Sequence, residues 1–142
     1  MKKTVLILLV SFISTPALAC KNVAISDGWI RLAPPGASVM AAYVQIKNNG
    51  NTPRTITTIS SKRFGAIEAH QTVIESGTSQ MRSLDSLTIP AHGELRLEPG
   101  GKHLMLFRPT KSPLQLGDKA VLNFRCAKSK PMKAEFVVKA AP

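Results

Sequence analysis

The sequence predicts an all-β protein with the architecture of an antiparallel Greek-key β-sandwich. Short segments rich in β-branched residues recur along the chain, and 9 Gly and 10 Pro among its 142 residues interrupt them at close intervals. No stretch of ten or more residues keeps an apolar helical face without meeting one of these breakers. Many short strands joined by such turns are typical of immunoglobulin-like sandwiches.

The first predicted strands are each followed by a clear turn. The bend Pro34-Pro35-Gly36 excludes a helix or a central strand at that point, because proline lacks a backbone donor. The run Asn48-Asn49-Gly50-Asn51 is a strong turn signal. Segment 54–60 is rich in Thr and Ile with clean alternation, which predicts one strand. The predicted strands in this half are 23–25, 29–32, 41–47 and 54–60.

The second half continues the same pattern. The turn Pro90-Ala91-His92-Gly93 separates two short apolar segments, and Pro99-Gly100-Gly101 leads into another strand. There is no internal repeat and no low-complexity linker, so we expect one domain over residues 20–142. The predicted strands are 66–73, 80–84, 87–89, 94–97, 103–107, 120–126 and 134–138.

The N-terminus has the pattern of a secretory signal peptide over residues 1–19. Lys2 and Lys3 precede the apolar run 5–13, and Ala17-Leu18-Ala19 supplies a small-x-small cleavage site. The apolar run is too short to span a bilayer, which takes about 20 such residues. No later segment is apolar enough to span a membrane. We therefore expect residues 20–142 to form an exported, soluble domain in the periplasm.

The chain is strongly basic, with 19 Lys and Arg against 8 Asp and Glu. A nucleic-acid partner is not expected, because the chain is exported, its basic residues are dispersed, and one Trp and one Tyr offer little base stacking. The charge is better explained as a solvated basic surface that favours loose contact with acidic partners or anionic membrane.

Two cysteines, Cys20 and Cys126, stand far apart in the sequence. In an oxidising compartment such a pair usually forms a structural disulfide. The alternative is that Cys20 is the acylated first residue of a lipoprotein. That modification normally requires Leu three residues before the Cys, where Ala17 stands instead, with Leu18 one position late. We therefore favour the disulfide.

The most informative pattern is a set of two histidines and two methionines: His70, Met81, His103 and Met105. His103 and Met105 are two residues apart, so on a strand both leave the same face while Leu104 and Leu106 face the core. His70 is expected to point outward, opposite Ile67. Met81 has no clear face from its neighbours, and a lone methionine is more often a core gap-filler than a ligand.

Imidazole and thioether together form a ligand set with a chemical preference. Thioether sulfur is soft and neutral, which suits Cu(I) far better than Mg²⁺, Ca²⁺ or Mn²⁺. No Cys, Asp or Glu belongs to the pattern, and a blue-copper site needs a Cys thiolate beside its two His. Structural zinc favours Cys or more His. The residues therefore predict a Cu(I) site rather than an electron-transfer or zinc site.

The spacing His70, ten residues, Met81, twenty-one residues, His103-Leu104-Met105 resembles the signature of the periplasmic copper chaperones of the PCuAC type. Segments around Glu68-Ala69-His70 and Pro99-Gly100-Gly101-Lys102-His103 also resemble that family, and the resemblance covers nearly all of residues 20–142. It implies a cupredoxin-like sandwich with the four residues as copper ligands. It also implies delivery of Cu(I) to the CuA domain of a haem-copper oxidase, or more general periplasmic copper trafficking.

Two other functions stay open at this point. One is a copper-sequestering protein that serves tolerance, and the other is an Ig-like interaction module whose His and Met are incidental. An enzyme is not expected, because the sequence lacks G-x-S-x-G, a Cys nucleophile with a His partner, and a carboxylate pattern supporting the histidines. We expect a monomer whose partners donate or accept copper.

Overall fold

Residues 20–142 are described by a computed structural model, and they form eleven β-strands without a helix. The predicted signal peptide, residues 1–19, lies outside the described residues. Within residues 20–142 there is accordingly no helix long and apolar enough to cross a membrane. The all-β class predicted from the sequence is confirmed.

Most predicted strands are observed within a few residues of their expected limits. In chain order the strands are β1 (Val23–Arg31), β2 (Val39–Asn48), β3 (Arg54–Ile56), β4 (Thr58–Ser60), β5 (Phe64–Glu75), β6 (Thr78–Leu84), β7 (Leu87–Ile89), β8 (Glu94–Leu97), β9 (Lys102–Pro109), β10 (Lys119–Arg125) and β11 (Met132–Lys139).

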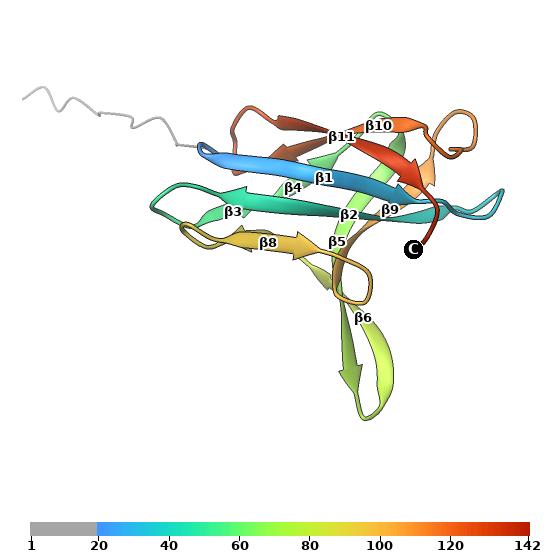
Figure 1. Cartoon of the computed structure of the whole chain (residues 1–142), viewed down its shortest axis with the longest axis horizontal. Helices are drawn as coiled ribbons and strands as arrows, with labels where there is room; N and C mark the ends of the chain where they lie inside the picture. The colour runs from blue at the N-terminus through green and yellow to red at the C-terminus, as the bar shows by residue number, and fades with distance from the viewer. Residues whose placement is uncertain (1–19) are drawn as a thin grey trace, which may run out of the picture.

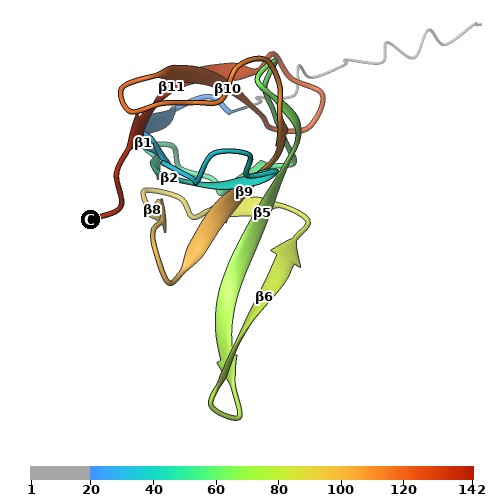
Figure 2. The same cartoon turned by 90° about the vertical axis from the view of Figure 1, so that its right-hand side faces the viewer.

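The strands form a sandwich in which one large sheet folds over on itself. Its strand order is β4-β10-β11-β1-β2-β9-β5-β6, and β8 also pairs with β2. β3 and β7 form a separate small sheet. β10 and β11 lie in one layer, and β2, β8 and β9 lie in the other (Figure 1 and Figure 2). β1 joins the layers because it pairs with both β11 and β2. The β1–β11 pair is parallel, so the expectation of purely antiparallel pairing is wrong there. These strands come from opposite ends of the chain, so no tight turn restricts their direction.

The prediction of a single strand over 54–60 is also wrong. The segment divides at Thr57: β3 pairs with β7 in the small sheet, whereas β4 pairs with β10 in the large one. The Thr57 amide donates to the Arg125 carbonyl at 2.9 Å, which starts the new pairing. Alternation of Thr and Ile continues through both halves, so the sequence pattern does not reveal the change of partner.

β1 combines two segments that the sequence separates. Its register with β2 shifts between Ser26 and Trp29, and Asp27 adopts a positive φ of 56°. A Cβ at Gly28 would lie 2.9 Å from the ring of Phe136. Glycine therefore allows this β-bulge to lie directly against the core.

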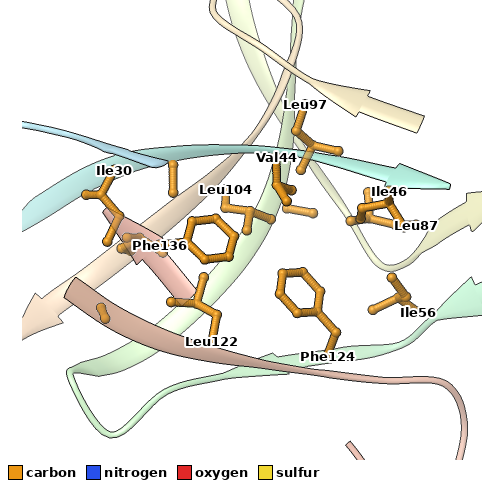
Figure 3. Packing of buried hydrophobic residues seen from close by; sticks show 14 of the residues in the cluster. Ile30, Val44, Ile46, Ile56, Leu87, Leu97, Leu104, Leu122, Phe124 and Phe136 are labelled. Carbon is orange, nitrogen blue, oxygen red and sulfur yellow. The ribbon is translucent and has the colours of Figure 1, made fainter. Parts of the chain in front are cut away.

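The core fills the space between the two layers. Phe124 and Phe136 are fully buried, with ring centroids 6.1 Å apart, and both belong to the layer that faces Leu104 (Figure 3). Leu104 and Leu106 of β9 are also fully buried. The predicted apolar face of β9 is thus the face that packs against the core, and Met105, between these leucines, faces away from it.

The buried Asn48 fixes the turn after β2. Its side-chain amide donates to the carbonyls of Thr52, Ile89 and Pro90, and its side-chain oxygen accepts from the Gly50 amide at 2.9 Å. The side chain is completely inaccessible to solvent, so these hydrogen bonds replace its hydration. The sequence identifies this residue only as part of a turn.

The β5–β6 hairpin extends beyond the rest of the sandwich (Figure 1 and Figure 2). β9 pairs with β2 as far as Leu104, beyond which β8 takes the place beside β2. The first residues of β9, Lys102 and His103, continue to pair with β5. The start of β9 therefore lies against the base of the projecting hairpin.

A disulfide joins Cys20 to Cys126, with Cα atoms 5.4 Å apart and a sequence separation of 106. Both cysteines are buried. The bridge ties the segment before β1 to the end of β10, as expected for a structural disulfide.

Removing this bridge with Cys20→Ser plus Cys126→Ser should lower the free energy of unfolding by about 2–4 kcal/mol, because a long loop then gains entropy in the unfolded chain. Urea denaturation of both proteins measures the difference. Intact mass spectrometry is the control: the oxidised chain should be lighter than the reduced chain by a pair of hydrogen atoms. A mass gain corresponding to acyl chains would contradict the bridge.

Candidate metal centre

His70 of β5 and His103 of β9 lie directly opposite each other in the sheet. Their ring centroids are 6.1 Å apart, and the ring planes are inclined by 30°. Bonds between a metal and an imidazole nitrogen are about 2 Å long. Two rings at this separation are therefore close enough to share one ion.

Met105 lies on the same face of β9 as His103. Across the ladder it is paired with Glu68, one strand repeat from His70. Its side chain is half-buried, so the thioether is not fully enclosed by the core. The two-residue spacing of His103 and Met105 thus places both side chains on one face of β9, as predicted.

Met81 reaches the same face from the neighbouring strand β6. It is paired with Thr72, so alternation places it on the side of the sheet that carries His70. It stands diagonal to His70 across the β5–β6 ladder, where side chains as long as methionine can still meet at a Cα separation of about 7–8 Å. Met81 is 62% exposed, so it forms the solvent-facing rim of the group.

The turn before β9 orients His103. The Nδ1 atom of His103 lies 3.1 Å from the Gly101 carbonyl oxygen, which can only accept a hydrogen bond. Neutral His103 therefore carries its proton on Nδ1, and the lone pair on Nε2 is left for a ligand bond. The same carbonyl accepts from the Thr72 amide at 3.2 Å, which ties the turn to β5.

A carboxylate supports His70, contrary to the expectation from the sequence. Glu68 Oε2 lies 3.0 Å from His70 Nε2, although no carboxylate pattern around the histidines was expected. The two residues share a face because they are two positions apart on one strand. The two-residue spacing could have indicated this pair from the sequence, but only the side-chain geometry shows the contact.

His70 is further set apart by its surroundings. The side chain is only 15% exposed, and the ring of Phe107 lies 6.4 Å away between centroids. The buried Nδ1 atom has no hydrogen-bond partner. An unpartnered buried nitrogen of this kind loses hydration without compensation, and a metal bond is one interaction that would replace it.

The group offers two imidazoles and two thioethers on one face of β6, β5 and β9. Both cysteines of residues 20–142 are in the disulfide, so no thiolate is available in this part of the chain. Within the same residues, no three His, Cys, Asp or Glu side chains lie close enough to hold a metal. Thioether sulfur among these side chains favours a soft ion over a hard one.

The remaining His and Met candidates lie elsewhere. His92 is exposed in the turn between β7 and β8, and Met40 is buried in the core. Met132 is partly buried and packs against the core where β11 begins.

Residues 23–138 match the family model LpqE-like, described as "Putative lipoprotein LpqE-like". The chain belongs to the LpqE-like family. A curated relative in Leifsonia xyli subsp. xyli, "Putative lipoprotein Lxx21020", is 32% identical over 112 residues, which is 78% of this chain and 66% of the relative. "Uncharacterized protein RP573" from Rickettsia prowazekii is 33% identical over 59% of this chain and 46% of its own length. The LpqE-like chain thus spans less than two-thirds of each of these curated relatives.

The fold of the LpqE-like chain is that of solved PCuAC domains, which are cupredoxin-like. "Copper-bound PCuAC domain from PmoF2" superposes with a TM-score of 0.70 at 19% identity, covering 84% of this chain and 94% of that domain. "CuI-DR1885 from Deinococcus Radiodurans" superposes with a TM-score of 0.65 at 25% identity, covering 87% and 81%. The cupredoxin-like sandwich implied by the sequence resemblance is confirmed.

The hydrogen bond to the Gly101 carbonyl predicts the tautomer of His103 in the metal-free protein. At a pH where His103 is neutral, it should be the Nδ1–H tautomer, because the carbonyl accepts only from a protonated Nδ1. Long-range ¹⁵N–¹H NMR correlations on the ring identify the protonated nitrogen, with the exposed His92 as an internal reference. A lone pair on Nδ1 of His103 would contradict this arrangement.

Proposed function

We propose that this protein is a periplasmic Cu(I) metallochaperone that carries one copper ion between His70, Met81, His103 and Met105. The observation that carries the proposal is the register of β6, β5 and β9, which collects these four side chains on one face with the two imidazoles directly opposed. Copper is the cargo of such a protein rather than a resident cofactor.

The chemistry of the donors supports Cu(I) as the ion. Two neutral thioethers and two neutral imidazoles bring no negative charge to the metal, which suits a soft monovalent ion better than a hard divalent one. Thioethers cannot form disulfides, so the set remains usable in an oxidising compartment. Similar folds include domains named as copper-bound, and one of them is named as a Cu(I) form.

The exposure of the donors supports carriage rather than storage. His103 is 6% exposed whereas Met81 is 62% exposed, so the proposed ion is held by a buried ligand on one side and a solvent-facing ligand on the other. An acceptor can replace the outer thioether first, without unfolding any strand. The proposed activity is binding and transfer of an ion, with no catalytic step.

Export follows from the sequence pattern at residues 1–19, and relatives named as lipoproteins are consistent with it. We place the protein in the periplasm. Because Cys20 is bonded to Cys126, we favour the disulfide over acylation at Cys20. The proposed acceptor is the CuA domain of a haem-copper oxidase, and the alternative is a tolerance role in which copper is held and not passed on.

The double variant Met81→Leu plus Met105→Leu should weaken Cu(I) binding by more than about 100-fold. Leucine keeps the side-chain volume but removes sulfur, and loss of direct ligands should exceed the roughly 10–100-fold effect of outer-shell changes. Anaerobic competition against a Cu(I) chelator measures the affinity, and X-ray absorption counts sulfur and nitrogen neighbours. Met132→Leu is the matched control and should bind as the unaltered protein does. Undiminished affinity in the double variant would contradict the ligand assignment.

The Cu(I)-loaded protein should transfer its ion to an isolated apo-CuA domain when the two are mixed under anaerobic, reducing conditions. The partly exposed Met81 gives the acceptor access to the ion. Copper content of the separated proteins measures the transfer. Tight binding without transfer would favour the tolerance role, and no Cu(I) uptake by this protein at all would favour an interaction module without metal.

A further inference from the structure

Glu68 is a carboxylate that forms a hydrogen bond with one of the proposed ligands, His70. Its Oε2 atom is 3.0 Å from His70 Nε2, and β-sheet pairing places the residue opposite Met105. The glutamate side chain is 53% exposed while that of His70 is 15% exposed. A side chain with free access to water thus reaches back to a largely buried ring.

This hydrogen bond determines where His70 carries its proton. An ionised carboxylate can only accept, so Nε2 must be the protonated nitrogen of the ring. The lone pair of neutral His70 then lies on Nδ1. That atom is buried and has no hydrogen-bond partner in the structure.

The two histidines are therefore held through different ring nitrogens. Gly101 accepts from Nδ1 of His103, which leaves Nε2 as the ligand atom, whereas Glu68 accepts from Nε2 of His70, which leaves Nδ1. In both cases a second group holds the ring by the nitrogen that is not needed for the metal. Metal-binding histidines are commonly held in this way by a carboxylate or a backbone carbonyl.

We propose that Glu68 is a positioning residue that holds His70 as the Nε2–H tautomer, so that Cu(I) binds His70 through Nδ1 and His103 through Nε2. The inference rests on the proposed function and specifies the nitrogen used by each ring. Glu68 acts through His70 and does not touch the ion, because a hard carboxylate oxygen is a poor ligand for soft Cu(I).

The first test compares Cu(I) affinity in Glu68→Ala, Glu68→Gln and Glu75→Ala. Glu75 is the matched control, since it lies on the same strand but on the opposite face, where it pairs with Arg82. Glu68→Ala should weaken binding by about 10–100-fold, as loss of a supporting partner usually does. Glu68→Gln should stay within about threefold, because its amide oxygen can still accept from Nε2–H. Glu75→Ala should leave the affinity unchanged.

The glutamine variant separates positioning from simple attraction between charges. Both Glu68 variants remove the negative charge, but only alanine removes the acceptor. Equal losses in the two variants would overturn the proposal in favour of charge or direct ligation. An unchanged affinity in Glu68→Ala would overturn it as well.

The second test locates the ring protons by ¹⁵N NMR with and without Cu(I). In the metal-free protein, His70 should be the Nε2–H tautomer, and Glu68→Ala should shift its ring nitrogens toward a mixture of tautomers. After Cu(I) loading, His70 should keep its Nε2 proton while the Nδ1 resonance moves. Metal coordination at Nε2 of His70 would overturn the proposal.

The two readouts distinguish failure of this inference from failure of the proposed function. If the unaltered protein and Glu75→Ala both fail to bind Cu(I), the proposed function is wrong, and this inference is wrong with it. If both bind copper but the tautomer of His70 does not depend on Glu68, only the positioning role is wrong.

Discussion

The pairing of β5 with β9 is the constraint on which the candidate site depends. One register places His70 opposite His103 and Glu68 opposite Met105, while it buries Leu104 and Leu106 on the other face. Because side chains alternate with a period of two, a slip by one residue would expose both leucines and bury the polar residues. The hydrophobic core therefore enforces the register that brings the two imidazoles together. Stability and site geometry share one cause.

The proposed site spans a buried part of the molecule and an exposed one. His103 is buried near the start of β9, and the Gly101 carbonyl holds its ring. Met81 lies on β6, an edge strand whose residues are almost all exposed. A ligand set that spans both regions can combine firm retention at the buried end with easy exchange at the exposed end. This gradient suits an ion that must be passed on.

Outside the site, the sandwich is closed by interactions that connect distant parts of the chain. The disulfide ties Cys20 to Cys126, and the parallel pairing of β1 with β11 brings the two ends of the domain together. Asn48 satisfies several carbonyls at the corner where β2 ends. Together these contacts hold the framework from which the β5–β6 hairpin projects.

The sequence by itself determined the β class, most strand positions, the cysteine pair and the shared face of His103 and Met105. Each of these follows from local information, because turn residues, two-residue alternation and compartment chemistry can be identified without knowing which strands are neighbours. Tertiary structure alone decided the division of 54–60 between two sheets, the parallel β1–β11 pair, and the face on which Met81 lies. It also decided that Glu68 and Gly101 each hold one imidazole. These features depend on register and on side-chain directions across strands, which are set by how the whole core packs and not by any local pattern.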